Sequence, residues 1–124
     1  GPRRVLLAGM TIMALGMFSF ALVTASRPAL IILPALLTGT GHSLMFHTMT
    51  SLTIAPFPTA VRGTASALAL MMLDLGTFAG APILGVIGEH FGFTALFASI
   101  GGFCLFSAMV FGLEPLRVSG QKRE

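Results

Sequence analysis

Charged side chains are scarce in this sequence. Its 124 residues include seven basic and four acidic side chains, so that 9% are charged, while 55% are hydrophobic and the mean hydropathy is +0.94. A soluble domain has about a quarter of its residues charged, so this composition excludes a water-soluble globule. It also excludes intrinsic disorder, which requires low hydrophobicity and high charge. The composition therefore predicts a protein embedded in a lipid bilayer.

Cysteine and catalytic motifs are equally sparse. The single cysteine, Cys104, excludes an internal disulfide and is expected to be a buried, inert thiol. No phosphate-binding loop, serine nucleophile motif, Cys-His-Asn set or HExxH motif occurs. His42 and His47 lie about 140° apart around a helix, so they cannot share one metal ion. We therefore expect no enzyme activity, no metal and no cofactor. The basic residues form no patch, so we expect no nucleic-acid partner.

Four segments with few or no charges are long enough to cross a bilayer. About twenty residues of helix span the hydrocarbon core of about 30 Å. The gaps between charges and prolines predict an all-α membrane protein with four antiparallel transmembrane helices, at about residues 5–26, 28–55, 63–88 and 93–113. Residues 114–124 form a polar tail. The first residue is Gly1 rather than Met and no signal peptide precedes the first span, so we expect the chain to be part of a longer one.

The basic residues predict the orientation of these helices. Arg3, Arg4, Arg62 and the three basic residues of the tail fall on one side if the chain crosses four times, and Arg27 falls on the other. Cytoplasmic loops carry an excess of Lys and Arg. We therefore expect a multi-pass protein of the inner (plasma) membrane with both termini, and hence residues 114–124, in the cytoplasm.

Polar side chains enter the membrane in the two middle helices. His42 and His47 lie in the helix at 28–55, and Asp74 lies near the middle of the helix at 63–88. An ionised carboxylate at the bilayer centre costs about 2.5–3.5 kcal/mol on insertion scales, so it must face a bundle interior, a water-filled cavity or a partner. Two interpretations of Asp74 stay open: it binds a cation or proton on a translocation pathway, or it accepts hydrogen bonds that fix helix packing. The histidines likewise contact either a substrate or a neighbouring helix.

The predicted helix at 63–88 also contains small residues and a proline. Gly76 and Gly80 are four residues apart and are followed by Gly85, a pattern typical of helices whose backbones pack closely in lipid. Pro82 removes one backbone hydrogen bond, so we expect it to bend the helix.

Two stretches resemble the major facilitator superfamily. The GPRR at residues 1–4 is similar to the end of the family's cytoplasmic loop signature. The stretch from Arg62 through Asp74 to the Gly-x-Pro-x-x-Gly of residues 80–85 resembles the penultimate helix of drug-exporter-like members. Because the family has twelve helices in two similar halves, four helices match either the third to sixth or the ninth to twelfth. The lack of an arginine just before Gly39 and the basic tail favour the last four.

The resemblance implies a secondary transporter, such as an antiporter, that moves a small solute by alternating access coupled to protons. Its partners would be membrane lipid, the remaining helices of the full-length chain and the solute. By resemblance, the helix at 28–55 lines the central cavity, the helix at 63–88 lies at the contact between halves, and the other two are peripheral. Arg3 and Arg4 would belong to the cytoplasmic gating loop. Arg62 would anchor its helix to lipid phosphate or to a helix C-terminus.

Two other kinds of membrane protein are also compatible with spans of this length. A self-contained four-helix scaffold or assembly subunit would show the same spans but would have no hydrophobic helices upstream. A small dimeric exporter of four helices relies on a membrane-embedded glutamate in its first helix, and residues 5–26 contain none.

Overall fold

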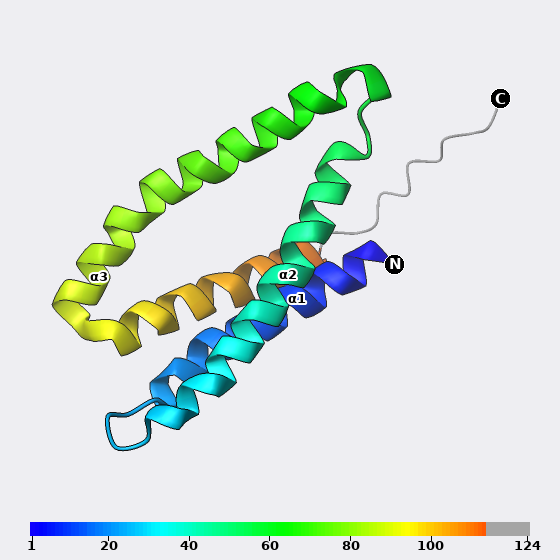
Figure 1. The fold of residues 1–124 in the computed structure, drawn as a ribbon. Helices are drawn as coiled ribbons and strands as arrows, with labels where there is room; N and C mark the ends of the chain where they lie inside the picture. The colour runs from blue at the N-terminus through cyan, green and yellow to red at the C-terminus, as the bar shows by residue number, and fades with distance from the viewer. Residues whose placement is uncertain (114–124) are drawn as a thin grey trace.

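The computed structural model describes residues 1–113, which form three α-helices (Figure 1). These are α1 (Pro2–Ser19), α2 (Ile32–Ile54) and α3 (Arg62–Leu113). Short 3-10 turns adjoin them: η1 (Phe20–Leu22), η2 (Pro28–Ile31) and η3 (Thr59–Val61). The polar tail expected at residues 114–124 lies outside the described residues. Three spans are long and apolar enough to cross a membrane, namely Pro2–Leu22, Pro28–Ile54 and Thr59–Leu113.

The first helix is shorter than the sequence predicts. Helix α1 begins beside Pro2, whose fixed φ suits a first turn, and the helical run ends at Leu22 because Val23 is extended. Residues 23–26, expected to be helical, form the loop to α2. There the hydroxyls of Thr24 and Ser26 lie 3.0 Å apart and the Arg27 amide donates to the Thr24 carbonyl. Thr and Ser favour such local bonds over helix, which explains the early end.

Helix α3 reverses direction at Gly92. This residue has φ 83° and ψ 169°. Every other residue of the helix, including Pro82, keeps helical backbone angles. Figure 1 shows the chain turning back at this point. We call the two parts segment 62–91 and segment 93–113. The sequence predicts a turn over residues 89–92, whereas the helix continues through Phe91, because glycine alone reverses the chain.

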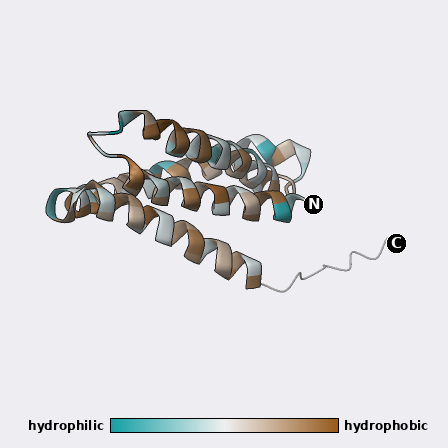
Figure 2. Ribbon diagram, turned by 90° about the horizontal axis from the view of Figure 1, so that it is seen from below, coloured by the Kyte–Doolittle hydropathy of each residue, from teal (hydrophilic) through white to brown (hydrophobic). Residues whose placement is uncertain are grey.

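Helix α1 lies at the centre of the packing. It contacts α2 along its length and also contacts α3, whereas α2 and α3 contact each other much less. In Figure 1, segment 62–91 runs apart from the other helices. Figure 2 shows hydrophobic residues along the helices and the most hydrophilic ones mainly towards their ends. The core of the described residues therefore lies around α1, where it meets α2 and segment 93–113, and most of the apolar surface of α3 is exposed.

Candidate functional site

Glycines hold α1 and α2 together and thereby fix which face of α2 points outward. A Cβ atom on Gly41 would lie 2.6 Å from the Met13 amide nitrogen, and one on Gly16 would lie 2.8 Å from that of Thr38. A Cβ on Gly9 would lie 3.0 Å from the Met45 amide nitrogen. No side chain fits at these contacts, so the helix backbones meet directly. The opposite face of α2 is left exposed.

These packing glycines were missed by sequence reasoning, which selected Gly76, Gly80 and Gly85. A Cβ atom on any of those three would meet nothing within 4 Å among the described residues. Their proposed packing therefore stays a prediction that concerns helices outside this part of the chain. The signal that was overlooked is the spacing of Gly9 and Gly16, which lie on one face of α1 two helical turns apart.

The exposed face of α2 carries both predicted histidines. The ring of His42 stacks on Phe46 with centroids 5.9 Å apart and an interplanar angle of 21°. The ring of His47 meets Phe46 edge-on, also at 5.9 Å. Phe46 thus contacts two histidines that point about 140° apart around the helix. Neither histidine side chain forms a hydrogen bond with another residue of the described chain.

Asp74 lies in the middle of segment 62–91, on an exposed surface. Its chain neighbours Leu73 and Leu75 are 52% and 57% exposed, so the carboxylate is surrounded by apolar surface. Within residues 1–113 it forms no ion pair and no hydrogen bond, with the two histidines or with any other group. The structure therefore leaves the carboxylate available to a proton, a cation or a group from outside these residues.

The arginines near the helix ends differ in their contacts. Arg3 donates to backbone carbonyls at the end of α3, a contact that sequence reasoning missed. Arg62 donates from Nε to the carbonyl of Phe57, in the loop that follows α2, at 3.1 Å. Arg4 is exposed, and its side chain forms no hydrogen bond with a described residue. Arg62 therefore connects the start of α3 to the loop that follows α2.

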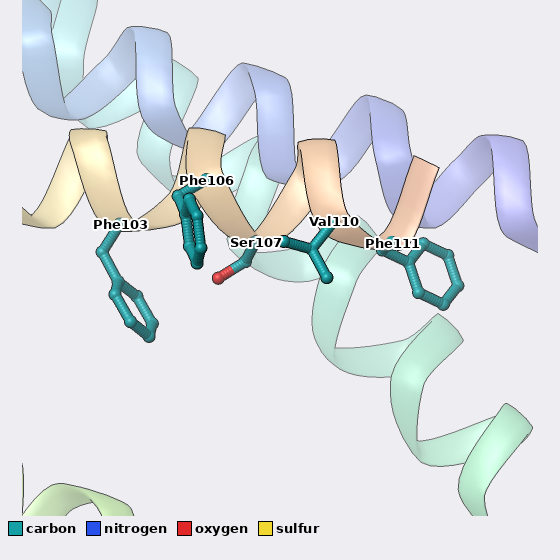
Figure 3. A pocket seen from close by; sticks show the side chains of 5 residues that line it. All are labelled: Phe103, Phe106, Ser107, Val110 and Phe111. Atoms are coloured by element: carbon teal, nitrogen blue, oxygen red, sulfur yellow. The ribbon is translucent and has the colours of Figure 1, made fainter. Parts of the chain in front are cut away.

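A shallow apolar depression of about 250 Å³ lies elsewhere, on segment 93–113. Five side chains of this segment line it (Figure 3). They are Phe103, Phe106, Ser107, Val110 and Phe111. None of the predicted site residues lines it, so we do not assign it to transport. Residues 1–113 also contain no group of three His, Cys, Asp or Glu side chains placed to bind a metal ion.

The comparisons with known proteins identify the family. The family model of the Major Facilitator Superfamily matches residues 1–124. The searches of curated proteins and of solved structures found no match. Members of this superfamily are membrane-embedded secondary transporters of small solutes and not enzymes, in agreement with the long apolar helices described above. The match thus confirms the sequence-based expectations of membrane insertion and of a transport rather than an enzymatic role, and the chain belongs to the major facilitator superfamily.

Proposed function

We propose that this chain supplies the last four transmembrane helices of a drug-exporter-like transporter, which moves a small solute by alternating access coupled to protons. The observation that carries the proposal is the placement of Asp74, an exposed carboxylate without a partner among residues 1–113, within an apolar helical segment. The proton coupling is assigned to this side chain.

The depth of Asp74 supports this role. It lies about 18 Å along the helix axis from Arg62. If Arg62 lies at the membrane interface, this distance places Asp74 close to the middle of a hydrocarbon core about 30 Å thick. An ionised carboxylate at this depth cannot face lipid without a large cost. In the complete transporter it therefore faces a water-filled cavity or another helix.

The geometry of α3 supports four crossings rather than three. A straight helix of the 55 residues Thr59–Leu113 would be far longer than a bilayer is thick. The reversal at Gly92 divides this span into segments 62–91 and 93–113, each of suitable length. In Figure 1 the connections alternate between the two ends of the helices. Arg3, Arg4 and Arg62 then share one side, which favours a cytoplasmic location for both termini.

The unequal packing supports separate roles for the helices. Helix α1 and segment 93–113 pack on each other, whereas α2 and segment 62–91 expose the two histidines and Asp74. We assign His42 and His47 on α2 to the solute pathway and Arg4 to the cytoplasmic gating loop. The open glycines of segment 62–91 are assigned to contacts with the opposing half of the transporter. These are Gly76, Gly80 and Gly85.

The proposal is tested by replacing Asp74 in the intact transporter, reconstituted in liposomes with a solute that the unmodified protein transports. We expect Asp74→Asn to abolish solute-driven proton movement while the protein accumulates normally, and Asp74→Glu to retain part of it, because only the latter keeps a titratable carboxyl group. Glu89→Gln is the matched control, since Glu89 is an exposed carboxylate beside the reversal at Gly92. Normal proton coupling by Asp74→Asn, or failure of both Asp74 variants to accumulate, would assign Asp74 to structure instead.

A further inference from the structure

The guanidinium group of Arg3 binds the end of α3. Its Nη2 lies 2.7 Å from the carbonyl oxygen of Phe111 and 3.1 Å from that of Gly112. The last four carbonyls of a helix have no partner within the helix, and they carry its negative dipole end. Arg3 thus supplies donors and positive charge where both are needed. The guanidinium also lies 5.4 Å from the centroid of the Phe111 ring, within the range of a cation–π contact.

The same two helical elements are held together at two further places. Near the other end of α1, the rings of Phe20 and Phe97 stack with centroids 4.1 Å apart and an interplanar angle of 13°. Between the two ends, a Cβ atom on Gly101 would lie 3.2 Å from the carbonyl oxygen of Ala14. Helix α1 and segment 93–113 are therefore joined near both ends and in the middle.

Segment 62–91 has no comparable contacts with this pair. Segment 62–91 runs apart from this pair in Figure 1 and most of its surface is exposed. Arg4 follows Arg3 directly, but its guanidinium group forms no hydrogen bond with any residue up to 113. The two adjacent arginines of the GPRR sequence thus have different tasks, which their shared position in the sequence does not reveal.

We propose that Arg3 is a positioning residue that locks α1 to segment 93–113, so that the two move as one rigid pair during the transport cycle. The moving contacts of the cycle then involve segment 62–91, which is not tied to the pair in this way, whereas the glycine contacts described above hold α2 to α1. Arg3 contacts backbone carbonyls rather than solute. Its role therefore differs from that of Arg4, which we place in the gating loop.

The first test compares Arg3→Gln, Arg3→Lys and Arg4→Gln in the intact transporter by amide hydrogen exchange. We expect Arg3→Gln to accelerate exchange in the last turn of α3 by about tenfold, the change that loss of one charge-assisted hydrogen bond causes in a local opening equilibrium. Arg3→Lys restores part of the protection, because it keeps the charge but loses the planar fork. Equal protection in Arg3→Gln and Arg4→Gln would overturn the proposal.

The second test leaves Arg3 unchanged and so does not depend on the folding of an Arg3 variant. Spin labels at Thr11 and Ser99, both exposed, report the distance between α1 and segment 93–113. A second pair at Ser99 and Leu68 reports on segment 62–91. Between inward-facing and outward-facing states we expect the first distance to stay constant and the second to change. A change in the Thr11–Ser99 distance in the unmodified transporter would show that the pair is not rigid.

Transport kinetics distinguish a positioning role of Arg3 from a direct contact between Arg3 and the solute. We expect Arg3→Gln to lower the maximal transport rate about fivefold with the apparent KM for solute unchanged, because the substitution affects a conformational step and not binding. A raised KM with an unchanged maximal rate would place Arg3 in the solute pathway and contradict the proposal.

Discussion

Gly9 and Gly41 bring the backbones of α1 and α2 into direct contact, since a Cβ atom on Gly41 would lie 2.9 Å from the carbonyl oxygen of Gly9. The atoms that a side chain would meet belong to the backbone of α1, so they cannot rotate aside. Within a bilayer no hydrophobic driving force holds helices together, and close packing takes its place. The association of α1 with α2 therefore depends on the absence of side chains at these positions.

Substitution of Gly41 by alanine tests this dependence. We expect Gly41→Ala to lower the free energy of unfolding by about 1–3 kcal/mol, because the helices must separate to admit the methyl group. Gly39→Ala, two residues earlier on α2, meets nothing within 4 Å and should change stability by less than about 0.5 kcal/mol. Thermal unfolding of the intact transporter in detergent measures both. Identical melting temperatures for the two variants would show that the contact is unimportant.

The reversal at Gly92 depends on its backbone angles. Its φ of 83° with ψ of 169° lies in a region that is nearly closed to other residues. We expect Gly92→Ala to cost about 1–3 kcal/mol of stability, as strain of this kind does. Gly102→Ala, in the helical part of segment 93–113 with open space around it, is the control. Denaturant titration of both variants provides the comparison, and equal losses would exclude backbone strain as the cause.

The stacked rings of Phe20 and Phe97 offer a further test of how α1 is joined to segment 93–113. We expect a double-mutant cycle with Phe20→Ala and Phe97→Ala to give a coupling energy of about 1 kcal/mol, typical of an aromatic pair. Phe103, whose side chain is 71% exposed, serves as the control partner and should show no coupling with Phe20. Strict additivity of Phe20→Ala and Phe97→Ala would mean that the stack does not stabilise the fold.

The proposed orientation can be tested by labelling single cysteines. With Cys104→Ala removing the native thiol, Ser26→Cys and Thr59→Cys place new thiols in exposed loops at opposite ends of the helices. We expect a membrane-impermeant maleimide to label intact cells at position 26, and to reach position 59 only after permeabilisation, because Lys and Arg are concentrated on the side of position 59. Labelling with the reverse pattern would overturn the cytoplasmic placement of the termini.

The membrane-spanning character of the chain can be predicted from the sequence because charge is the dominant signal. Residues 5–22 and 28–54 are free of charge, and a bilayer tolerates little else over such lengths. The exact helix ends cannot be predicted in the same way. No charge marks the end of α1 at Leu22, which is set instead by the local hydrogen bonds of Thr24 and Ser26.

Some residues of the candidate site can likewise be predicted from the sequence, and others cannot. Asp74 and His42 can be selected from the sequence because a polar group in an apolar run is costly, whatever the fold. The contact between Arg3 and Phe111 cannot, because 108 positions separate the two residues and only the fold brings them together. For glycines, spacing shows which residues share a face but not what that face meets. Gly76 and Gly80 accordingly share an open face, whereas Gly9 and Gly41 meet across two helices.

The turn at Gly92 limits what the two parts of α3 can do. Because the link is a single residue, their near ends stay only a few ångströms apart, and neither part can slide lengthwise past the other. Any rearrangement between them must be a hinge rotation about Gly92. Small changes of angle at Gly92 then displace the distant tips, beside Arg62 and Leu113, the most.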